Sequence, residues 1–285
     1  MKAAMMRNWA GAALFAVALG ASFASHGQAA KNGEFTPQVG QAGKDVIWVP
    51  TPEELVERML RMAQTTSSDF VFDLGSGDGR TVIVAAKKFG ATAQGIEYNP
   101  EMVALSQKNA QAAGVAAKAT FAKADLFETD LSKATVITMY LLPSINAKLK
   151  PKILALKPGT RVVSHAFDME DWTPDEMSTV EGRRAMLWIV PAKVNGVWRM
   201  RLGEGNEPEL SITQRYQMLE GGIRYGRLTA GLREPRVNGD RISFTFMDQA
   251  GNLHAATGKV TGDTMEGTLR PLAGGGPEVR WTARR

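Results

Sequence analysis

The sequence predicts an α/β domain built on an open sheet, followed by an antiparallel β module. Apolar, strand-like runs alternate with helical patterns between residues 46 and 165, and a glycine-rich turn joins the first such run to a helix. Residues 203–285 instead show short strand patterns separated by turn signals. Strands that alternate with helices are typical of a parallel sheet, whereas strands separated only by turns are typical of an antiparallel meander.

The glycine-rich turn covers residues 73–80, with the sequence DLGSGDGR. It follows the apolar run 70–72 and precedes a helical pattern, 81–88, that ends at Gly90. The glycines of the turn are Gly75, Gly77 and Gly79. Glycines let a ligand approach the backbone, and a helix N-terminus offers oriented N–H donors. This strand, turn and helix therefore predict a nucleotide-binding corner.

The residues flanking the glycines indicate which ligand binds. Arg80 stands where the dinucleotide fingerprint has its third glycine. Asp73 and Asp78 would repel a diphosphate but attract an ammonium or sulfonium group. S-adenosylmethionine carries both cations and no phosphate, so it is the predicted cofactor. An ordinary Gly-Asp loop without a ligand is the alternative.

Two further carboxylates follow the next two strand patterns along the chain. The strand pattern 93–96 ends at Glu97, where a carboxylate can accept hydrogen bonds from both ribose hydroxyls. The strand pattern 119–122 leads to Asp125, which can accept from the adenine amino group, and the N–H of Leu126 can donate to a ring nitrogen. Either carboxylate alone would also suit a solvated loop, but the two occur in the expected order.

Two more strand patterns end in polar or aromatic residues. Residues 135–139 lead to Tyr140, and residues 161–164 lead to His165. Open α/β sheets bind ligands at the carboxyl ends of their strands, so these side chains are expected at the same edge. No Cys, His and acidic cluster with metal-ligand spacing is apparent, so no metal site is predicted.

Helices and a hairpin are predicted around these strands. Residues 51–54 read as a capping box with Thr51 at the N-cap, and Pro100 opens a helix that stops at Gly114. The patterns 186–190 and 197–200 flank Asn195-Gly196, which predicts a two-residue hairpin closing the first sheet.

The stretch from Val46 to about Arg201 resembles class I S-adenosylmethionine-dependent methyltransferases. More narrowly, it resembles the lysine methyltransferases that modify the adenine nucleotide translocase and the ATP synthase c-subunit, together with their bacterial relatives. The matching segments are 49–52, 73–80, 95–100, 125–127, 140–143 and 158–165. The resemblance implies a Rossmann-like sheet and methyl transfer to a protein lysine. It adds Asn99 to the cofactor residues and makes Trp48 and Thr51 candidates for a lid.

The implied reaction is an in-line displacement by a neutral lysine amine. Tyr140 is expected to orient the incoming amine, and His165, expected at the rim of the same edge, could accept a proton. A core tyrosine and a structural histidine are the alternatives for these two residues.

Residues 1–30 read as a targeting segment. Lys2 and Arg7 precede an apolar run from Trp9 to Ala24, followed by small residues that suit cleavage. The run is short for a bilayer span of about 20 residues, which favours a secretory signal over a membrane anchor. Export to the periplasm, or anchoring at the inner membrane, conflicts with a cofactor that is made in the cytosol. The resembling enzymes also carry a hydrophobic N-terminal segment and act on membrane-embedded proteins. An uncleaved, cytosol-facing anchor is therefore an alternative, and membrane proteins are among the protein substrates that the resemblance implies.

The carboxyl third predicts a meander, either a small closed barrel or a sheet. Turn signals occur at 221–222, 238–240, 250–252 and 261–263. Substrate docking, dimerisation, envelope binding and simple stabilisation are its open roles. The net charge of +5 includes no basic run with interleaved aromatics, so nucleic-acid binding is not expected.

The predicted organisation has four parts: a signal or anchor at 1–30, a linker at 31–45, a methyltransferase domain at 46–202 and a β-rich module at 203–285. Two other functions stay open. One is methylation of a small molecule or lipid with the same cofactor residues. The other is a non-catalytic envelope-binding protein that keeps the fold.

Overall fold

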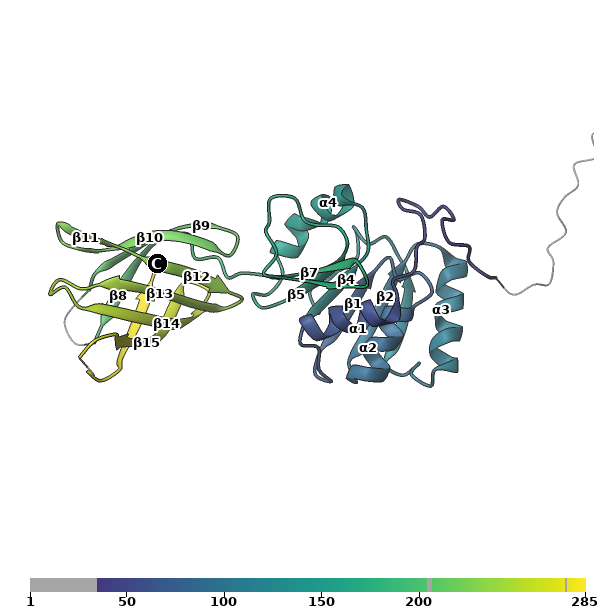
Figure 1. Cartoon of the computed structure of the whole chain (residues 1–285), viewed down its shortest axis with the longest axis horizontal. Helices are drawn as coiled ribbons and strands as arrows, with labels where there is room; N and C mark the ends of the chain where they lie inside the picture. The colour runs from purple at the N-terminus through teal and green to yellow at the C-terminus, as the bar shows by residue number, and fades with distance from the viewer. Residues whose placement is uncertain (1–34, 204–206, 275) are drawn as a thin grey trace, which may run out of the picture. The chain divides into compact units, whose positions relative to one another are not determined.

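The computed structural model describes residues 35–203, 207–274 and 276–285 (Figure 1). The predicted targeting segment, residues 1–30, and the first part of the predicted linker lie outside the described residues. Within these described ranges the helices and strands lie between Glu53 and Arg284, and the strands form two sheets.

The first sheet has the strand order β3-β2-β1-β4-β5-β7-β6. Its strands are β1 (Phe70–Leu74), β2 (Thr92–Glu97), β3 (Ala119–Lys123), β4 (Val136–Met139), β5 (Arg161–His165), β6 (Glu176–Val180) and β7 (Arg183–Ile189). Strands β1 to β5 pair in parallel, and β7 pairs antiparallel with β5 and β6. The chain order reverses between β1 and β4, which creates a crevice at the carboxyl ends of these strands.

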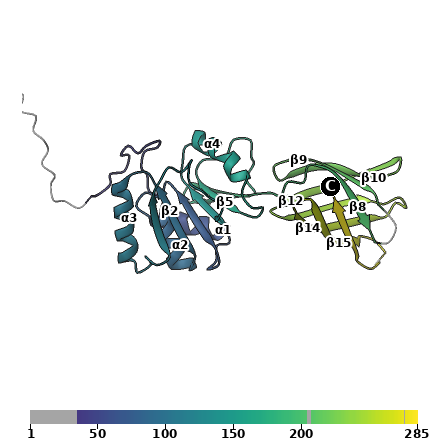
Figure 2. The ribbon, with the colours of Figure 1, turned by 180° about the vertical axis from the view of Figure 1, so that it is seen from behind.

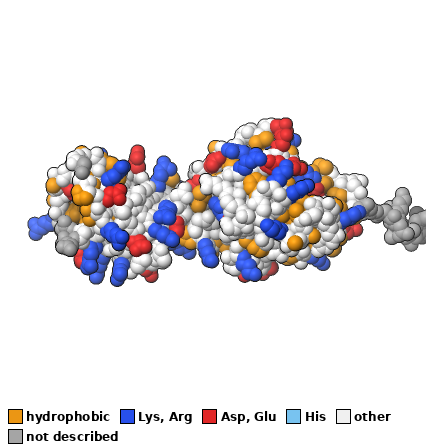
Figure 3. Space-filling view, turned by 90° about the horizontal axis from the view of Figure 1, so that it is seen from below, with side chains coloured by type: hydrophobic (Ala, Val, Ile, Leu, Met, Phe, Trp, Pro, Cys, Tyr) orange, Lys and Arg blue, Asp and Glu red, His pale blue; other side chains and the backbone are white. Residues whose placement is uncertain are grey.

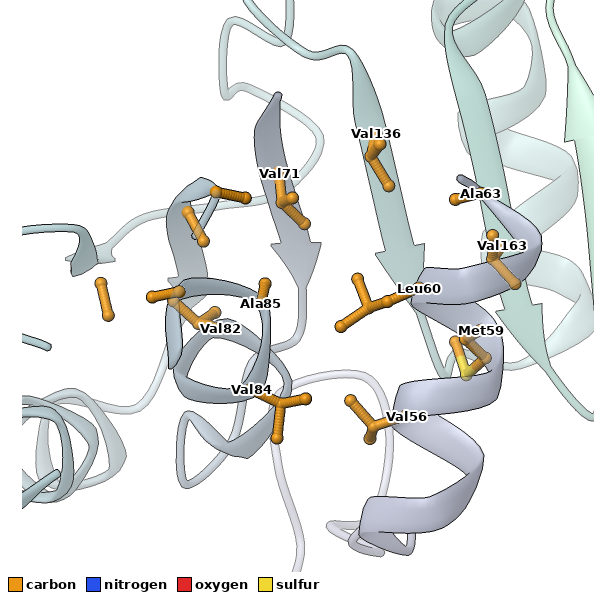
Figure 4. Packing of buried hydrophobic residues seen from close by; sticks show 14 of the residues in the cluster. Val56, Met59, Leu60, Ala63, Val71, Val82, Val84, Ala85, Val136 and Val163 are labelled. Carbon is orange, nitrogen blue, oxygen red and sulfur yellow. The ribbon is translucent and has the colours of Figure 1, made fainter. Parts of the chain in front are cut away.

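Helices cover both faces of this sheet. They are α1 (Glu53–Met62), α2 (Arg80–Phe89), α3 (Pro100–Ala112) and α4 (Pro143–Leu154). Successive residues of a strand point to opposite faces, so Val71 packs with the cluster of α1, α2 and α3, while Phe72 packs with that of α4. Figure 4 shows Leu60 of α1 between the strands that carry Val71 and Val136, and Val56 of α1 facing Val84 of α2.

Two local predictions were wrong. Helix α1 begins at Glu53 with Pro52 at the N-cap and no side-chain cap, because the Thr51 hydroxyl bonds His165 instead. The predicted hairpin around Asn195-Gly196 does not form. Strand β7 pairs with β6, whereas β8 (Gly196–Leu202) joins the second sheet by pairing with β9 and β16. Strand β8 therefore pairs with the next strand in sequence, β9, and with the distant β16 rather than with the preceding β7.

The second sheet is antiparallel and closes on itself as a barrel. It contains β8 with β9 (Glu209–Arg215), β10 (Met218–Tyr225), β11 (Leu228–Gly231), β12 (Arg233–Asn238), β13 (Arg241–Met247), β14 (Leu253–Thr261), β15 (Thr264–Pro271) and β16 (Val279–Arg284). The pairing of β9 with β10 closes the ring, as Figure 2 shows from behind. Buried Trp198, Phe244 and Trp281 fill its interior.

The turn predicted at Gly221-Gly222 was also wrong, because both residues lie inside β10. A Cβ on Gly221 would lie 2.0 Å from the carbonyl oxygen of Ser211 on β9. The glycine therefore serves a close approach of two backbones rather than a turn. The other three turn signals fall between β12 and β13, β13 and β14, and β14 and β15, as predicted.

The surplus of positive charge is unevenly divided along the chain. Residues 37–195 contain 18 Lys and Arg against 18 Asp and Glu, and residues 196–285 contain 13 against 10. Figure 3 shows charged side chains of both signs mixed on the face in view. The part that carries the first sheet therefore has no net charge with which to attract a polyanion at long range.

Of the described helices, which lie between Glu53 and Leu154, none is both long and apolar enough to cross a bilayer.

Candidate active site

A pocket opens where β1, β2 and β4 end at their carboxyl termini. It contains about 1080 Å³ of space, part of it open to solvent. Its floor comes from the glycine loop, and its cover comes from a hairpin of residues 40–48 held by backbone hydrogen bonds between Gly40, Gln41 and Trp48. We call this hairpin the strap. Its residues 41–45 were predicted as linker but line the pocket.

The glycine loop adopts a backbone that side chains would disfavour. Gly75 and Gly77 have φ of +76° and +54° and line the pocket. A Cβ on Gly77 would lie 2.5 Å from Nε1 of Trp48, so the strap indole packs directly on the loop. Gly79 does not line the pocket. Its position faces Ser106 and Phe121, and its expected cofactor role is therefore replaced by a packing role.

Asp73 lies at the end of β1, buried at 6% exposure. Its Oδ1 accepts a hydrogen bond from the Thr138 hydroxyl at 2.7 Å. Burial raises the pKa of Asp73 to about 7, with smaller upward effects from the charges of Asp78 and Glu97. A cation at this position would compensate the buried charge, because an opposite charge favours the ionised carboxylate.

Asp78 has a different environment from Asp73. Arg80 forks onto it, with Nε 3.0 Å from Oδ1 and Nη2 2.6 Å from Oδ2. Two parallel charge-assisted bonds of this kind neutralise the carboxylate. Of the two acidic residues that flank the glycines, Asp73 is therefore the one left without a cationic partner.

Glu97, the last residue of β2, holds the glycine loop by a hydrogen bond. Its Oε2 accepts from the N–H of Gly77 at 3.0 Å, and its Oε1 accepts from the N–H of Asn99 at 2.9 Å. Each oxygen keeps a second lone pair for a further donor. The Asn99 side chain caps α3 by accepting from the N–H of Glu101, so it orders the turn after Glu97.

Asp125 stands at the far end of the pocket beside Leu126. Its Oδ1 accepts from the N–H of Phe127, and its Oδ2 accepts from Nζ of Lys44 at 2.6 Å. The hydrogen bond from Lys44 lowers the pKa of Asp125. Lys44 also lies 4.7 Å from the centre of the Tyr98 ring, so this strap residue covers the position predicted for adenine.

Lys44→Met is expected to change the dissociation constant of S-adenosylhomocysteine by less than about fivefold. Exposed ion pairs contribute little free energy, so a ligand can displace Lys44 from Asp125 easily. Isothermal titration checks this, with Lys123→Met as the matched control because Lys123 is an exposed lysine outside the pocket. A loss of 50-fold or more would show instead that Lys44 itself holds the ligand.

Tyr140 lies at the end of β4 and lines both this pocket and a second, adjoining one. The second pocket has mainly apolar walls, contributed by the strap and the segment after Tyr140. Its exposed members include Ile47, at 60% exposure, and Leu142. Phe167 lines it too and stacks on Tyr140 with ring centres 5.9 Å apart.

The sequence predicts His165 at the rim of the pocket, but the structure does not place it there. It is 4% exposed, lines neither pocket and stacks beneath Tyr140 with ring centres 3.8 Å apart. Burial lowers its pKa to about 4, with a smaller contribution from the charge of Arg183. A buried imidazole of this kind is a weak base, so its expected role as a proton acceptor is not supported by its placement.

Several pocket residues escaped prediction. The main ones are Lys44, Arg80 and Tyr98, and the apolar walls Met59, Met102, Met139 and Ile145. The apolar residues carry helix or strand periodicity and looked like core. Lys44 belongs to a segment without periodicity, so no sequence signal placed it on Asp125.

These residues fit S-adenosylmethionine. The buried Asp73 carboxylate has no cationic partner among the described residues and suits an ammonium group. The Glu97 carboxylate at the end of a strand suits the two ribose hydroxyls. The glycine-lined floor lets the ligand contact the backbone closely. The buried Ser76 hydroxyl of the same loop also has no hydrogen-bond partner. Asp73, Gly75, Gly77, Glu97 and Asp125 would hold the cofactor.

Comparison with known proteins finds methyltransferase relatives of this chain. Residues 73–176 match the family described as "ANTKMT methyltransferase domain". A protein-lysine N-methyltransferase of Saccharolobus islandicus is 49% identical over 138 residues, which are 48% of this chain and 86% of that protein. The lysine N-methyltransferase of the ATP synthase c-subunit from Mus musculus is 38% identical over 150 residues, which are 52% of this chain and 60% of that enzyme.

A solved structure shares the fold at similar identity. The RNA methyltransferase of Salinibacter ruber, in complex with S-adenosyl-L-homocysteine, is 50% identical with a TM-score of 0.50, over 51% of this chain and 96% of that one. The chain thus covers nearly the whole of two relatives and about three fifths of the mouse enzyme. It belongs to the family of S-adenosylmethionine-dependent class I methyltransferases that includes these protein-lysine N-methyltransferases.

Proposed function

We propose that this chain methylates a lysine side chain of a protein substrate. The observation that carries the proposal is the position of Tyr140, which lines both the cofactor pocket and the adjoining apolar pocket. An acceptor in the second pocket would therefore meet the cofactor beside Tyr140. Two of the relatives, the protein-lysine N-methyltransferase of Saccharolobus islandicus and the ATP synthase c-subunit lysine N-methyltransferase of Mus musculus, support lysine as the acceptor.

The walls of the second pocket suit a lysine chain. Four methylene groups can lie against Ile47, Leu142 and Phe167, which bury apolar surface while the amine reaches Tyr140. Desolvation by these walls favours the neutral amine, which is the nucleophilic form. When bound, S-adenosylmethionine supplies an electrophilic methyl group. The protein residues supply orientation and exclude water.

Methylation of RNA is the second candidate, because the Salinibacter ruber relative is titled an RNA methyltransferase. The charge of this chain argues against it. Residues 37–195, which contain the pocket, hold equal numbers of basic and acidic residues. An RNA-binding domain usually carries a clustered basic surface.

The test is methyl transfer from radiolabelled S-adenosylmethionine by the full chain. A membrane fraction, soluble proteins, total RNA and a lipid extract from the source cells serve as separate acceptors. We expect label in protein, recovered as methyllysine after acid hydrolysis. A Glu97→Ala variant is the control for contaminating activity. Label confined to RNA or lipid would overturn the lysine proposal and leave the methyltransferase assignment standing.

A further inference from the structure

Three segments that are far apart in the sequence meet behind the second pocket. They are 49–52 before α1, 140–143 after β4, and the end of β5, joined through Thr51, Tyr140 and His165. The Thr51 hydroxyl shares a hydrogen bond of 3.0 Å with Nδ1 of His165. The His165 ring in turn stacks on Tyr140 with centres 3.8 Å apart and planes at 29°. Thr51 thus fixes the ring against which Tyr140 lies.

Thr51 also contacts the cofactor side. Its carbonyl oxygen accepts from Nη1 of Arg80 at 3.2 Å, and Arg80 forks onto Asp78 of the glycine loop. Thr51 itself lines the cofactor pocket, whereas His165 lies behind it. One residue therefore connects the loop that holds the cofactor with the ring stack that borders the acceptor.

We propose that Thr51 and His165 are positioning residues, which hold the Tyr140 ring in register with the glycine loop for methyl transfer. The proposal rests on the proposed function, because it concerns the acceptor side of the same site. It gives His165 a role other than proton transfer. It also gives Thr51, which does not cap α1, a role in the site.

The expected effect falls on turnover rather than on cofactor binding. A valine at position 51 keeps the volume of threonine but cannot bond the imidazole, so Tyr140 loses its fixed support. Small displacements of a group that orients a reactant can lower rates by about 100-fold. We expect Thr51→Val to lower kcat by about 10- to 100-fold, with the KM for S-adenosylmethionine changed by less than about threefold. Thr51→Ser should restore most of kcat.

A second variant removes the other partner of the hydrogen bond. His165→Phe keeps an aromatic ring under Tyr140 but has no nitrogen for Thr51. If both residues act as one unit, the double variant should lose no more activity than the worse single variant, because coupled residues are not additive. Thr160→Val is the matched control, since Thr160 is a buried threonine at the other end of β5. It should leave kcat unchanged.

The experiment combines steady-state kinetics with NMR of the histidine rings, of which the full chain has three. We expect the His165 Nδ1 signal to shift on S-adenosylhomocysteine binding in the wild type and to lose that response in Thr51→Val. A wild type without turnover would contradict the proposed function, while the NMR response still tests the coupling. Any of three results would overturn this inference. The first is turnover in Thr51→Val equal to that of the wild type. The others are multiplicative losses of kcat in the double variant and an NMR response in Thr51→Val that is unchanged from the wild type.

Discussion

Glu97→Ala is expected to weaken S-adenosylhomocysteine binding by about 100-fold or more. The variant removes the acceptors predicted for two ribose hydroxyls, and hydrogen bonds to a charged group contribute about 1.5–3 kcal/mol each. It also removes the acceptor for the N–H groups of Gly77 and Asn99, so the glycine loop loses an anchor. Isothermal titration of the full chain measures the loss.

Glu101→Gln is the matched control for Glu97. Glu101 is an exposed carboxylate on the first turn of α3 and does not line the pocket. Its variant should bind as the wild type does. Glu97→Gln should fall between the wild type and Glu97→Ala, because the amide keeps one acceptor but loses the charge. Unchanged binding by Glu97→Ala would contradict the placement of the ribose at this residue.

Cofactor binding should depend on pH through Asp73. The pKa of Asp73 in the free protein is raised to about 7 by burial, so the carboxyl is mostly protonated below that pH. An ammonium group prefers the ionised form and would lower this pKa. We therefore expect binding to release a proton near pH 6.5, and affinity to fall by about tenfold per pH unit below pH 7. Titration in buffers of different ionisation enthalpy measures the proton release.

The same pKa shift has the opposite consequence for the free protein. The folded state binds a proton that the unfolded chain has lost between pH 4 and 7, so stability should fall as pH rises through this window. Asp73→Asn should abolish the proton release on binding, reduce the fall of stability with pH, and bind the cofactor weakly at every pH. Asp175→Asn is the control for binding, because burial also raises the pKa of Asp175 but this residue lies outside the pocket. Proton release on binding that persists in Asp73→Asn would assign it to another group.

Much of the first sheet follows from local sequence. Its parallel strands are short apolar runs bounded by glycines or by polar residues, and both signals act within a few residues. Gly90 ends α2 in a left-handed conformation, and Pro100 opens α3 at its first turn, as the sequence predicts. The candidate cofactor residues Asp73, Glu97 and Asp125 meet because parallel strands end at one edge.

The remaining features depend on contacts between distant segments. Asn195-Gly196 has the composition of a tight hairpin, but β8 pairs with β9, which follows it, and with β16 at the far end of the described chain. Thr51 is a residue type that favours the N-cap, but its hydroxyl forms a hydrogen bond with a histidine 114 residues away. Gly79 and Gly75 look alike in the motif, yet Gly79 faces Phe121 and Gly75 faces the pocket. Tertiary packing decides each of these cases.

A crystal structure of the full chain with S-adenosylhomocysteine tests the central claim most directly. We expect the ammonium group beside Asp73, the ribose hydroxyls on Glu97, and the adenine amino group on Asp125 in place of Lys44. The sulfur should face Tyr140 and the adjoining pocket. A ligand bound elsewhere, or an ordered but empty pocket at saturating ligand, would contradict the assignment of this site.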